Sequence, residues 1–349
     1  MISFRSDYSL GAHPKVLEAL IKTNYEHTDG YGIDSHCRNA ERLVKEMIGN
    51  ADCGVHMMIG GTPCNITVIS SALKPYETVI SVRTGHIYAH ETGGIEATGH
   101  RITAVEGING KLTPALIDKA FEEYDDEHTA KPGMAYISLP TETGTVYTKA
   151  ELNALCEKCK EKNIYLYVDG ARLGSALTCG ACDISLRDLA KLCDAFYIGG
   201  TKNGALYGEA LVILDKDIND HFRWMIKRQG VMLAKGRTIG VQFEALLEGG
   251  DDCVYFQAAR HANKMADILR KGLSSMNISF LGDSPTNQVF PILPLSVVEK
   301  LENDFFFYRW GLEKDGKTAV RFVTSWGTTE TEIEELLCQT GKLMGKSLC

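Results

Sequence analysis

Short apolar runs rich in β-branched and aromatic residues alternate with amphipathic stretches along the first two thirds of the chain. Each run has the length of a strand, and between the runs apolar residues recur at helical spacing. Strands separated by helices in this rhythm indicate a mostly parallel sheet covered on both faces. We therefore predict a large α/β domain with a seven-stranded sheet. Its predicted strands are VHMMI (55–59), TVISV (78–82), RITAV (101–105), MAYISL (134–139), IYLYVD (164–169), AFYIG (195–199) and ALVIL (210–214).

Two helices are predicted before the first strand. Residues 13–28 place apolar side chains on one helical face, and Pro14 stands at the beginning of that helix. The second helix runs from Arg38 to Ile48, where Gly49 provides a stop.

The last third of the chain has a different pattern. Residues 215–275 have helical spacing and include the basic segment KRQGVMLAKGR (227–237). A final helix begins with Thr329 and Glu332 in capping-box spacing. Between these helical parts, three further strands are predicted, ISFLG (278–282), QVFPIL (288–293) and AVRFVTS (319–325). The pattern indicates a smaller α+β domain at the C-terminus.

We divide the chain into three parts on this basis. Residues 1–36 form an N-terminal segment that packs with the small domain, and residues 37–245 form the large domain. Residues 246–349 form the small C-terminal domain. No internal repeat or low-complexity linker is found in the sequence.

Composition restricts the possible partners and the compartment. The chain has 349 residues, of which 44% are hydrophobic, and its formal net charge is -8 with acidic and basic residues interspersed. Nucleic acid is excluded as a partner because its phosphate backbone needs a basic face. No stretch has the roughly 18 apolar residues of a membrane span, and the start lacks the apolar segment of a secretory signal. Eleven scattered cysteines are typical of free thiols, so we expect a soluble cytoplasmic protein.

An acidic and a basic residue follow two neighbouring predicted strands. Asp169 ends the strand in YLYVDGAR (165–172), and Lys202 lies in a Gly-rich turn after the next strand. Ligands of open α/β sheets bind at the carboxyl ends of strands, so both side chains should meet at one edge. Pyridoxal phosphate suits this pair, because a lysine forms an imine with its aldehyde and an aspartate keeps its ring nitrogen protonated. Taken singly, the aspartate is also typical of a turn and the lysine of a solvated surface.

A third segment is suited to bind phosphate. MIGGTPCN (58–65) follows a predicted strand and leads into a helix. Gly60, Gly61 and Thr62 therefore offer backbone N–H groups and a hydroxyl at the positive end of a helix dipole. An ordinary turn between a strand and a helix would have the same sequence character.

These segments belong to a longer series that resembles the threonine aldolase and β-eliminating lyase family of fold-type I pyridoxal-phosphate enzymes. The resemblance spans nearly the whole chain, with VDGAR and GGTKNGAL as its most specific parts. The series is SDY (6–8), GYGID (30–34), GGTPCN (60–65), GHIYAHE (85–91), VDGARLG (168–174), GGTKNGALYGEAL (199–211) and VRFVTSWGTTETEI (320–333).

The resemblance implies a role for each matching residue around the cofactor. Lys202 matches the Schiff-base lysine, Asp169 the partner of the ring nitrogen, and His86 the imidazole that stacks on the cofactor. Gly61 and Thr62 match the phosphate-binding turn that Gly60 opens, and Thr201, which precedes the lysine, is assigned to the cofactor as well.

The resemblance also implies a set of substrate ligands. Arg172 resembles the arginine beside the cofactor hydroxyl and the substrate carboxylate, and Ser6 and Arg321 resemble the remaining carboxylate ligands. For Arg321 there is an independent reason, because a guanidinium in an apolar strand needs a planar carboxylate partner. An internal Asp or Glu would also satisfy it.

One segment departs from the family pattern. Members that cleave threonine commonly carry a histidine ahead of the VDGAR strand, where it contacts the substrate β-hydroxyl, but the stretch here reads ISLPTETGTVY (137–147). His86 would then handle the proton alone, His128 would reach in from a loop, or Glu142 would substitute. Glu91, in the GHIYAHE segment, is a further candidate for the site.

The resemblance implies a homodimer or homotetramer with the active site between subunits. Candidates for residues donated by a neighbouring subunit are Tyr31, Lys227, Arg228, Lys235 and Arg237. A solvated basic surface is the ordinary explanation for such a run.

Two CxxC pairs raise the alternative of a metal or redox site. Cys156 and Cys159 are separated by nineteen residues from Cys179 and Cys182, which matches a four-cysteine zinc spacing. The strand between the pairs would hold them roughly 20 Å apart, too far to share a zinc ion. The first pair also comes too late in its helix for a thioredoxin-like motif, which belongs at a helix N-terminus. We therefore expect no metal.

The sequence thus favours a pyridoxal-phosphate-dependent carbon–carbon lyase that cleaves threonine or allo-threonine to glycine and an aldehyde. β-Elimination or transamination on the same cofactor is the rival enzymatic hypothesis, since all three reactions start alike. A cofactor-free scaffold is the rival outside enzymology. A nicotinamide-dinucleotide enzyme is disfavoured because no G-x-G-x-x-G follows the first strand.

Overall fold

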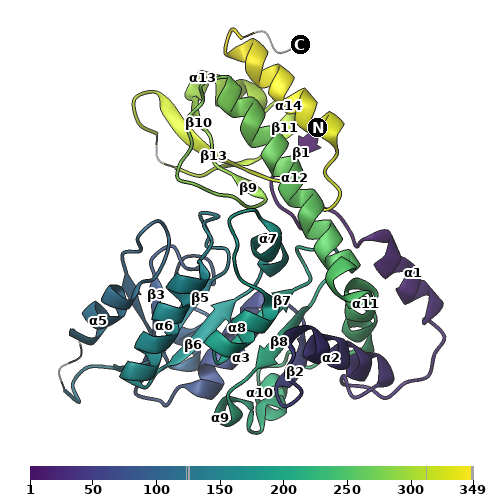
Figure 1. Ribbon diagram of the computed structural model, residues 1–349, viewed down its shortest axis with the longest axis vertical. Helices are drawn as coiled ribbons and strands as arrows, with labels where there is room; N and C mark the ends of the chain where they lie inside the picture. The colour runs from purple at the N-terminus through teal and green to yellow at the C-terminus, as the bar shows by residue number, and fades with distance from the viewer. Residues whose placement is uncertain (123, 125, 312, 347–349) are drawn as a thin grey trace.

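The computed structural model describes residues 1–122, 124, 126–311 and 313–346. A large body carries a seven-stranded sheet, and a smaller body with both chain ends sits above it (Figure 1). The long helix α12 (Val254–Ser275) runs from one body into the other.

Seven strands of the described chain form the large sheet in the order β2-β8-β7-β6-β5-β3-β4. Strand β8 is antiparallel to both of its neighbours, and the remaining pairs are parallel. All seven strands predicted from the sequence are confirmed, with bounds that shift by three residues or fewer. They are β2 (Gly54–Met58), β3 (Glu77–Val82), β4 (Arg101–Val105), β5 (Lys131–Ser138), β6 (Tyr165–Asp169), β7 (Ala195–Gly199) and β8 (Glu209–Ile213).

Both faces of this sheet are buried, as the near-continuous apolar runs require. On β5, Ala135 and Ile137 face one core while Met134 and Tyr136 face the other. The first core is covered by α1 (Pro14–Lys22), α2 (Ser35–Ile48), α5 (Pro114–Glu122), α6 (Lys149–Lys162), α7 (Leu173–Thr178), α8 (Leu186–Leu192), α11 (Arg237–Leu247) and the start of α12. The second is covered by α3 (Gly61–Ala72), α4 (His86–Ala89), α9 (Lys216–Asn219) and α10 (Phe222–Arg228).

The predicted helix signals act as expected at most helix ends. Pro14 opens α1, and Gly49 ends α2 in the left-handed region at φ +68°. Helix α2 begins three residues before the predicted start, because the Asp34 side chain accepts a hydrogen bond from the Cys37 N–H at 2.9 Å and caps it. The capping box that opens α14 (Glu330–Leu343) at Thr329 is confirmed.

The small body is built on β13 (Lys317–Val323), which pairs with three short strands. The prediction of a strand at 278–282 is wrong, since Phe280 makes a single bridge to Pro291. Proline has no N–H to extend a ladder, and Gly282 turns the chain away at φ +78°. The other elements here are β9 (Gln288–Val289), β10 (Ile292–Pro294), α13 (Leu295–Leu301), β11 (Phe305–Phe306) and β12 (Tyr308–Arg309).

The N-terminal segment contacts both bodies. Strand β1 (Ile2–Ser3) pairs in parallel with β11, and Phe4 is buried in the small core. Helix α1 instead packs on α11 of the large body. The three-part division of the chain made from the sequence stays a prediction.

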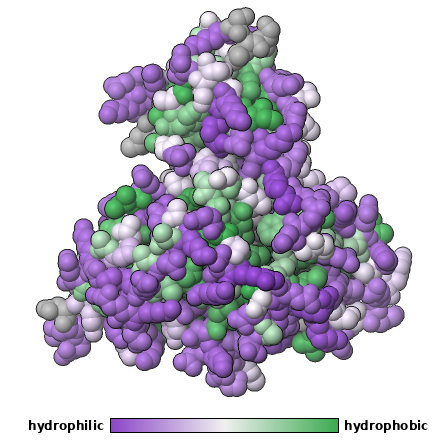
Figure 2. Space-filling model, in the orientation of Figure 1, coloured by the Kyte–Doolittle hydropathy of each residue, from purple (hydrophilic) through white to green (hydrophobic). Residues whose placement is uncertain are grey.

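The surface is mixed in character. Figure 2 shows polar side chains over most of the visible face, with apolar side chains scattered between them. No helix among residues 1–122, 124, 126–311 and 313–346 is long and apolar enough to cross a lipid bilayer.

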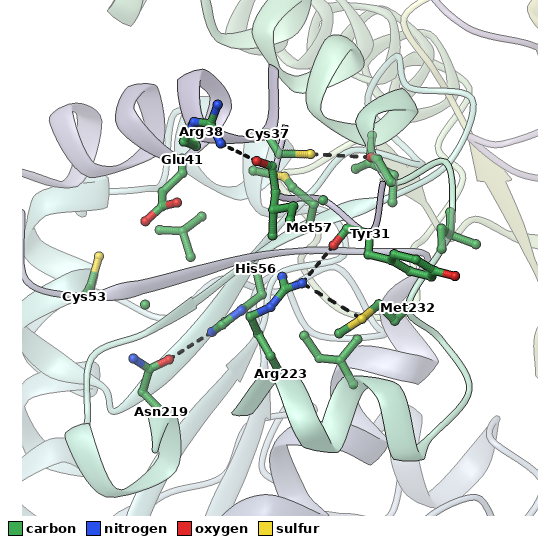
Figure 3. A pocket seen from close by; sticks show the side chains of 18 of the residues that line it. Tyr31, Cys37, Arg38, Glu41, Cys53, His56, Met57, Asn219, Arg223 and Met232 are labelled. Carbon is green, nitrogen blue, oxygen red and sulfur yellow. Dashed lines mark hydrogen bonds between the residues drawn. The ribbon is translucent and has the colours of Figure 1, made fainter. Parts of the chain in front are cut away.

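A cavity of about 460 Å³ lies between α2, β2 and α10 (Figure 3). Arg223 on α10 donates to the backbone carbonyl of Tyr31 at 2.9 Å, and Asn219 contacts the His56 ring at 2.9 Å. These contacts tie the N-terminal loop to the edge of the sheet beside β2.

We predict that Phe322→Ala destabilises the small body strongly. Phe322 is fully buried and packs edge-on against Phe4 and Phe307, with ring centroids 6.0 and 5.0 Å away. Removal of a buried phenyl ring should lower the free energy of unfolding by about 3–5 kcal/mol in a urea titration. The matched control is Phe306→Ala, since that ring is 47% exposed, and it should change the free energy by about 0.5 kcal/mol or less. Equal effects of the two substitutions would contradict this packing.

Candidate functional site

A cavity of about 430 Å³ lies where the carboxyl edge of the large sheet faces the small body. Its walls come from three parts of the chain, the N-terminal segment, the loops after the large strands and the sheet of the small body. The lining residues are Tyr8, His86, His90, Glu142, Arg172, Lys202, Gln288, Tyr308, Arg309, Trp310 and Arg321.

Asp169 ends β6 at this edge with its carboxylate buried. Its Oδ1 accepts hydrogen bonds from the Tyr197 hydroxyl at 2.5 Å and the Ala171 N–H at 3.0 Å. Its Oδ2 accepts from the Tyr136 hydroxyl at 2.7 Å and the Asn65 amide at 3.1 Å. Four donors thus fix the orientation of this carboxylate.

The surroundings keep Asp169 ionised. Burial by itself would raise the pKa of Asp169, but the positive charge of His86 and the hydroxyls of Tyr197 and Tyr136 lower it below its ordinary value. The site therefore has a fixed buried anion that can bind a protonated ring nitrogen.

Lys202 lies in the loop between β7 and β8. The N–H groups of Gly200 and Thr201 both donate to the Gly208 carbonyl at 3.1 Å, which closes the loop. Burial and the nearby charge of Arg172 lower the pKa of Lys202, against the opposing charges of Asp7 and Asp169. A larger neutral fraction makes the amine a better nucleophile.

His86 lines the same cavity as Lys202, and the charges of Asp169 and Lys202 both act on its pKa. Its Nδ1 contacts Glu91 Oε1 at 2.8 Å, and the Asn65 amide donates to the same oxygen at 2.7 Å. Burial by itself would lower the pKa of His86, but the hydrogen bond to Glu91 and the charge of Asp169 raise it. A continuous polar chain therefore joins His86 to Asp169 through Glu91 and Asn65.

Glu142 also lies in the cavity. Its Oε1 accepts the backbone N–H of His86 at 2.9 Å and the Ser138 hydroxyl at 2.6 Å. Burial raises the pKa of Glu142, and the charge of Asp169 adds to this effect. His128, the other alternative considered, is 82% exposed and bonded to Asp126 just before β5, at the opposite edge of the sheet.

The predicted phosphate turn lies at the start of α3. Gly60 precedes the helix, and Gly61 and Thr62 form its first turn, where N–H groups have no partner within the helix. A Cβ atom at Gly61 would come within 2.7 Å of the Tyr197 hydroxyl, so glycine is required for this close approach. The turn therefore packs directly on a residue that binds Asp169.

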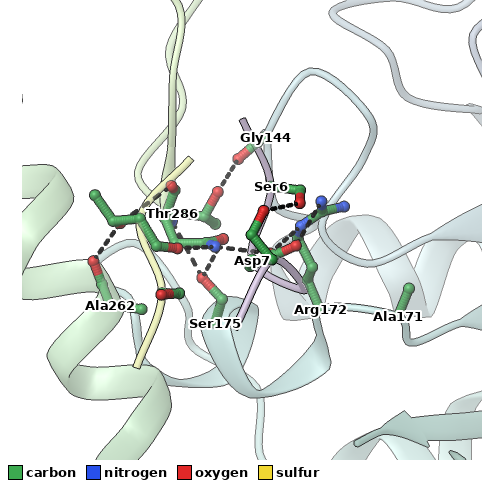
Figure 4. Close-up of polar contacts among 12 residues, drawn as sticks. Ser6, Asp7, Gly144, Ala171, Arg172, Ser175, Ala262 and Thr286 are labelled. Atoms are coloured by element: carbon green, nitrogen blue, oxygen red, sulfur yellow. Dashed lines mark hydrogen bonds and ion pairs between the residues drawn. The ribbon is translucent and has the colours of Figure 1, made fainter. Parts of the chain in front are cut away.

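Arg172 is bound by Asp7 (Figure 4). Its Nε and Nη2 donate to the two Asp7 oxygens at 2.6 and 3.0 Å, and Asn287 donates to the same carboxylate at 2.9 Å. Ser6 shares a hydrogen bond of 2.8 Å with Ser9. The assignment of Ser6 and Arg172 to the substrate carboxylate stays a prediction. Arg172 keeps its other N–H groups for a further ligand.

Arg321 points from β13 into the cavity. The guanidinium carbon lies 4.3 Å from the centre of the Trp310 ring and 5.3 Å from that of Tyr308. Its buried Nε has no hydrogen-bond partner in the part of the chain that the structure describes. Burial and the charge of Arg172 lower the pKa of Arg321 to about 10. No carboxylate of the described residues therefore binds this Nε, which could donate to an anionic ligand.

The candidates for residues donated between subunits lie away from this cavity. Lys227 stacks on the Tyr31 ring at 4.8 Å, beside the cavity of Figure 3. Arg228 and Lys235 are exposed, and Arg237 donates to the Thr23 carbonyl at 2.8 Å. In one chain, none of these five residues lines the site.

Several site residues were not predicted from the sequence. Asn65 ends the GGTPCN segment, and its amide side chain, three residues after Thr62, was the feature from which it could have been predicted. Tyr136 and Tyr197 are ordinary strand tyrosines in the sequence, and Trp310 belongs to no strong pattern. His90 lies in the GHIYAHE segment but was not singled out there. Only the pairing of strands and domains brings these side chains together.

The two CxxC pairs are well separated from the site. Cys156 and Cys159 are buried in α6 near the amino edge of the sheet, and Cys179 and Cys182 follow α7. Among the described residues, no group of three or more His, Cys, Asp or Glu side chains is arranged to hold a metal ion.

Comparisons with known proteins agree on one family. A family model described as beta-eliminating lyase matches residues 3–294. A low specificity L-threonine aldolase of Pseudomonas sp. is 30% identical over 98% of this chain and 97% of its own length. A solved threonine aldolase of Leishmania major is 43% identical with a TM-score of 0.96, over 99% of this chain and 100% of that one. A Thermus thermophilus aspartate aminotransferase variant shares the fold at 16% identity and a TM-score of 0.73, over 98% and 91% of the two chains.

We predict that Glu91→Gln lowers the pKa of His86. The substitution keeps an acceptor for the imidazole N–H but removes the negative charge that stabilises the imidazolium. NMR titration of the His86 ring protons measures the change. Glu96→Gln, at an exposed glutamate in the same segment, should leave the His86 pKa unchanged. An unchanged value in Glu91→Gln would mean that Glu91 does not control this imidazole.

Proposed function

Because this chain belongs to the beta-eliminating lyase family, whose members depend on pyridoxal phosphate, we propose that it binds this cofactor and cleaves a β-hydroxy-α-amino acid. Threonine or allo-threonine would give glycine and acetaldehyde. One observation carries the proposal. Lys202 and Asp169 follow neighbouring strands at the same edge of the sheet, and Lys202 shares a cavity with Arg321, whose buried Nε has no partner among the described residues.

The residues at this edge fit the cofactor. Lys202 would hold its aldehyde carbon, Asp169 its ring nitrogen and His86 one face of its ring. The turn of Gly60, Gly61 and Thr62 would bind its phosphate through N–H groups, with the Thr201 hydroxyl beside it. When bound, pyridoxal phosphate supplies an electron-accepting ring that stabilises negative charge at the substrate Cα.

Substrate binding would rely on charge and planarity. The Arg321 guanidinium contacts the rings of Trp310 and Tyr308, which restrict it, so that its N–H groups would present a fork to a carboxylate. Arg172, fixed by Asp7, would add a second cation on the same side of the cavity. Together the two arginines select a free α-carboxylate and orient the bonds at Cα.

The chain's own residues must also move a proton at the substrate β-hydroxyl. Removal of this proton lets the Cα–Cβ bond break to release the aldehyde, and a proton added at Cα then completes glycine. His86 and Glu142 are the predicted candidates. His90 joins them, because its ring lies 5.6 Å from His86 and burial lowers its pKa, which favours the neutral base. We assign the proton to this group of three, with Glu142 in the segment where related enzymes carry histidine.

Members of this family are typically oligomeric. We extend the proposal to a homodimer or homotetramer with the site between subunits. Tyr31, Lys227, Arg228 and Lys235 are exposed on one chain, where they are available to a neighbour's site, while Arg237 is partly buried against Thr23.

We predict that the purified protein with pyridoxal phosphate releases glycine and acetaldehyde from threonine or allo-threonine. Lys202→Ala should abolish this release, since it removes the amine that anchors the cofactor. Cys156→Ala, in α6 outside the cavity, should leave turnover nearly intact. Pyruvate formed from serine or cysteine, without glycine from any substrate, would instead establish β-elimination. Absence of any absorbance from bound cofactor would favour a scaffold.

We predict that Arg321→Ala lowers kcat/KM for the amino acid by roughly 30-fold or more, equivalent to about 2–5 kcal/mol for the loss of a buried charged hydrogen bond. Cofactor absorbance should remain, since Arg321 does not belong to the predicted cofactor contacts. The control is Arg309→Ala at the rim of the same cavity, where Glu302 already binds the guanidinium at 2.6 Å. Similar losses in both variants would count against a specific carboxylate site.

A further inference from the structure

Glu209 is a buried carboxylate that the catalytic proposal does not use. It is the first residue of β8 and 4% exposed. In the sheet it pairs with Met58 of β2 on one side and Gly199 of β7 on the other. Met58 leads into the phosphate turn and Gly199 leads into the Lys202 loop, so Glu209 lies between the two.

The side chain of Glu209 is directed at this loop. Its Oε2 accepts the Gly200 N–H at 2.7 Å. The hydroxyl and N–H of Thr201 also lie beside the carboxylate and partly counter the effect of burial on the pKa of Glu209. The hydroxyl accepts the Gly208 N–H at 3.0 Å and donates to the Gly208 carbonyl over a long 3.5 Å, so a nearby anion offers its single proton a better acceptor.

The groups that face Glu209 carry little positive charge to balance a second anion. Lys202 is the positively charged residue whose charge lowers the pKa of Glu209. The charge of Glu209 raises the pKa of four neighbouring groups. It is the largest charge effect on the Cys64 thiol in the first turn of α3, and it also acts on three hydroxyls, those of Tyr167 on β6, Tyr197 on β7 and Tyr255 on α12. Burial raises the pKa of each of these four groups, so all stay neutral near pH 7. Helix α11 adds the apolar side chains of Ile239 and Phe243 beside Gly208 and Gly200.

We propose that Glu209 takes up a proton when a phosphate dianion binds at the Gly60–Thr62 turn, so that loading of the cofactor is coupled to pH. This inference rests on the proposed function, because it requires pyridoxal phosphate at that turn. Two anions would otherwise compete for the one Thr201 proton in a buried site. A protonated Glu209 releases the hydroxyl to the phosphate and removes the repulsion.

The free protein is poised for this step. Burial raises the pKa of Glu209 to about 7, close to neutral pH. A phosphate nearby raises this pKa further. A group whose pKa is higher in the complex takes up protons on binding, and affinity therefore falls as pH rises above the value of the free protein.

The test compares the wild type with Glu209→Gln, which keeps an acceptor for the Gly200 N–H but cannot ionise. Binding of pyridoxal phosphate is followed by absorbance between pH 6.5 and 8.5, and calorimetry in two buffers of different ionisation enthalpy counts the protons. The wild type should take up more protons than the variant, by close to one above pH 7. The affinity ratio of variant to wild type should rise by up to about tenfold per pH unit there.

Glu77→Gln is the matched control. Glu77 is also a buried glutamate at the start of a strand and accepts the Lys74 N–H at 2.9 Å, but it lies at the opposite edge of the sheet. This variant should behave like the wild type. Ionisation of the free cofactor is common to all three proteins and cancels in the comparison. The pyridoxal measurement accounts for Lys202, whose pKa the Glu209 charge also raises.

A second measurement does not depend on the variant. Pyridoxal, which lacks the phosphate, should bind the wild type without the extra proton. Equal proton uptake in the wild type and Glu209→Gln, or equal uptake with both ligands, would overturn the role of Glu209. Failure of the wild type to bind pyridoxal phosphate at any pH would overturn the proposed function instead.

Discussion

The site depends on the burial of one carboxylate. An anion inside a protein is tolerated only where donors surround it. For Asp169 these donors come from β5, β7, α3 and the turn after β6, so four elements must meet at one point. This requirement fixes the edge of the sheet at which the cofactor turn, the lysine loop and the imidazole converge. The catalytic geometry therefore follows from satisfying a charge in the core.

The small body contributes the positive charge of Arg321, opposite in sign to that of Asp169. Strand β13 places Arg321 against two aromatic faces, and β12 supplies Tyr308 directly across from it in the ladder. The large body holds Asp169, Lys202 and Arg172, while the small body adds Arg321 to the same cavity wall. Neither part forms the cavity alone, and helix α12, which belongs to both cores, maintains their contact.

Much of this arrangement follows from the sequence because strands and turns are local patterns. All seven large strands, the positions of Lys202 and Asp169 at one edge, and the turn before α3 could be predicted in this way. The partners of Asp169 could not, since Tyr136, Tyr197 and Asn65 meet it only through pairing of distant strands. The predicted strand at 278–282 was wrong because its neighbour is a proline. Glu209 was not predicted because ligands were expected at the carboxyl ends of strands. Strand β8 runs antiparallel to its neighbours, so its amino end, where Glu209 stands, reaches the site.

The isolated state of Arg321 has a thermodynamic consequence for the whole molecule. A buried donor without an acceptor weakens the free protein, because its lost hydration is not replaced. Under the proposed function, a carboxylate bound at Arg321 would restore that bond and bridge the two bodies across their interface. Ligand recognition and the mutual attachment of the two bodies would then be one equilibrium, with a stability that rises on binding.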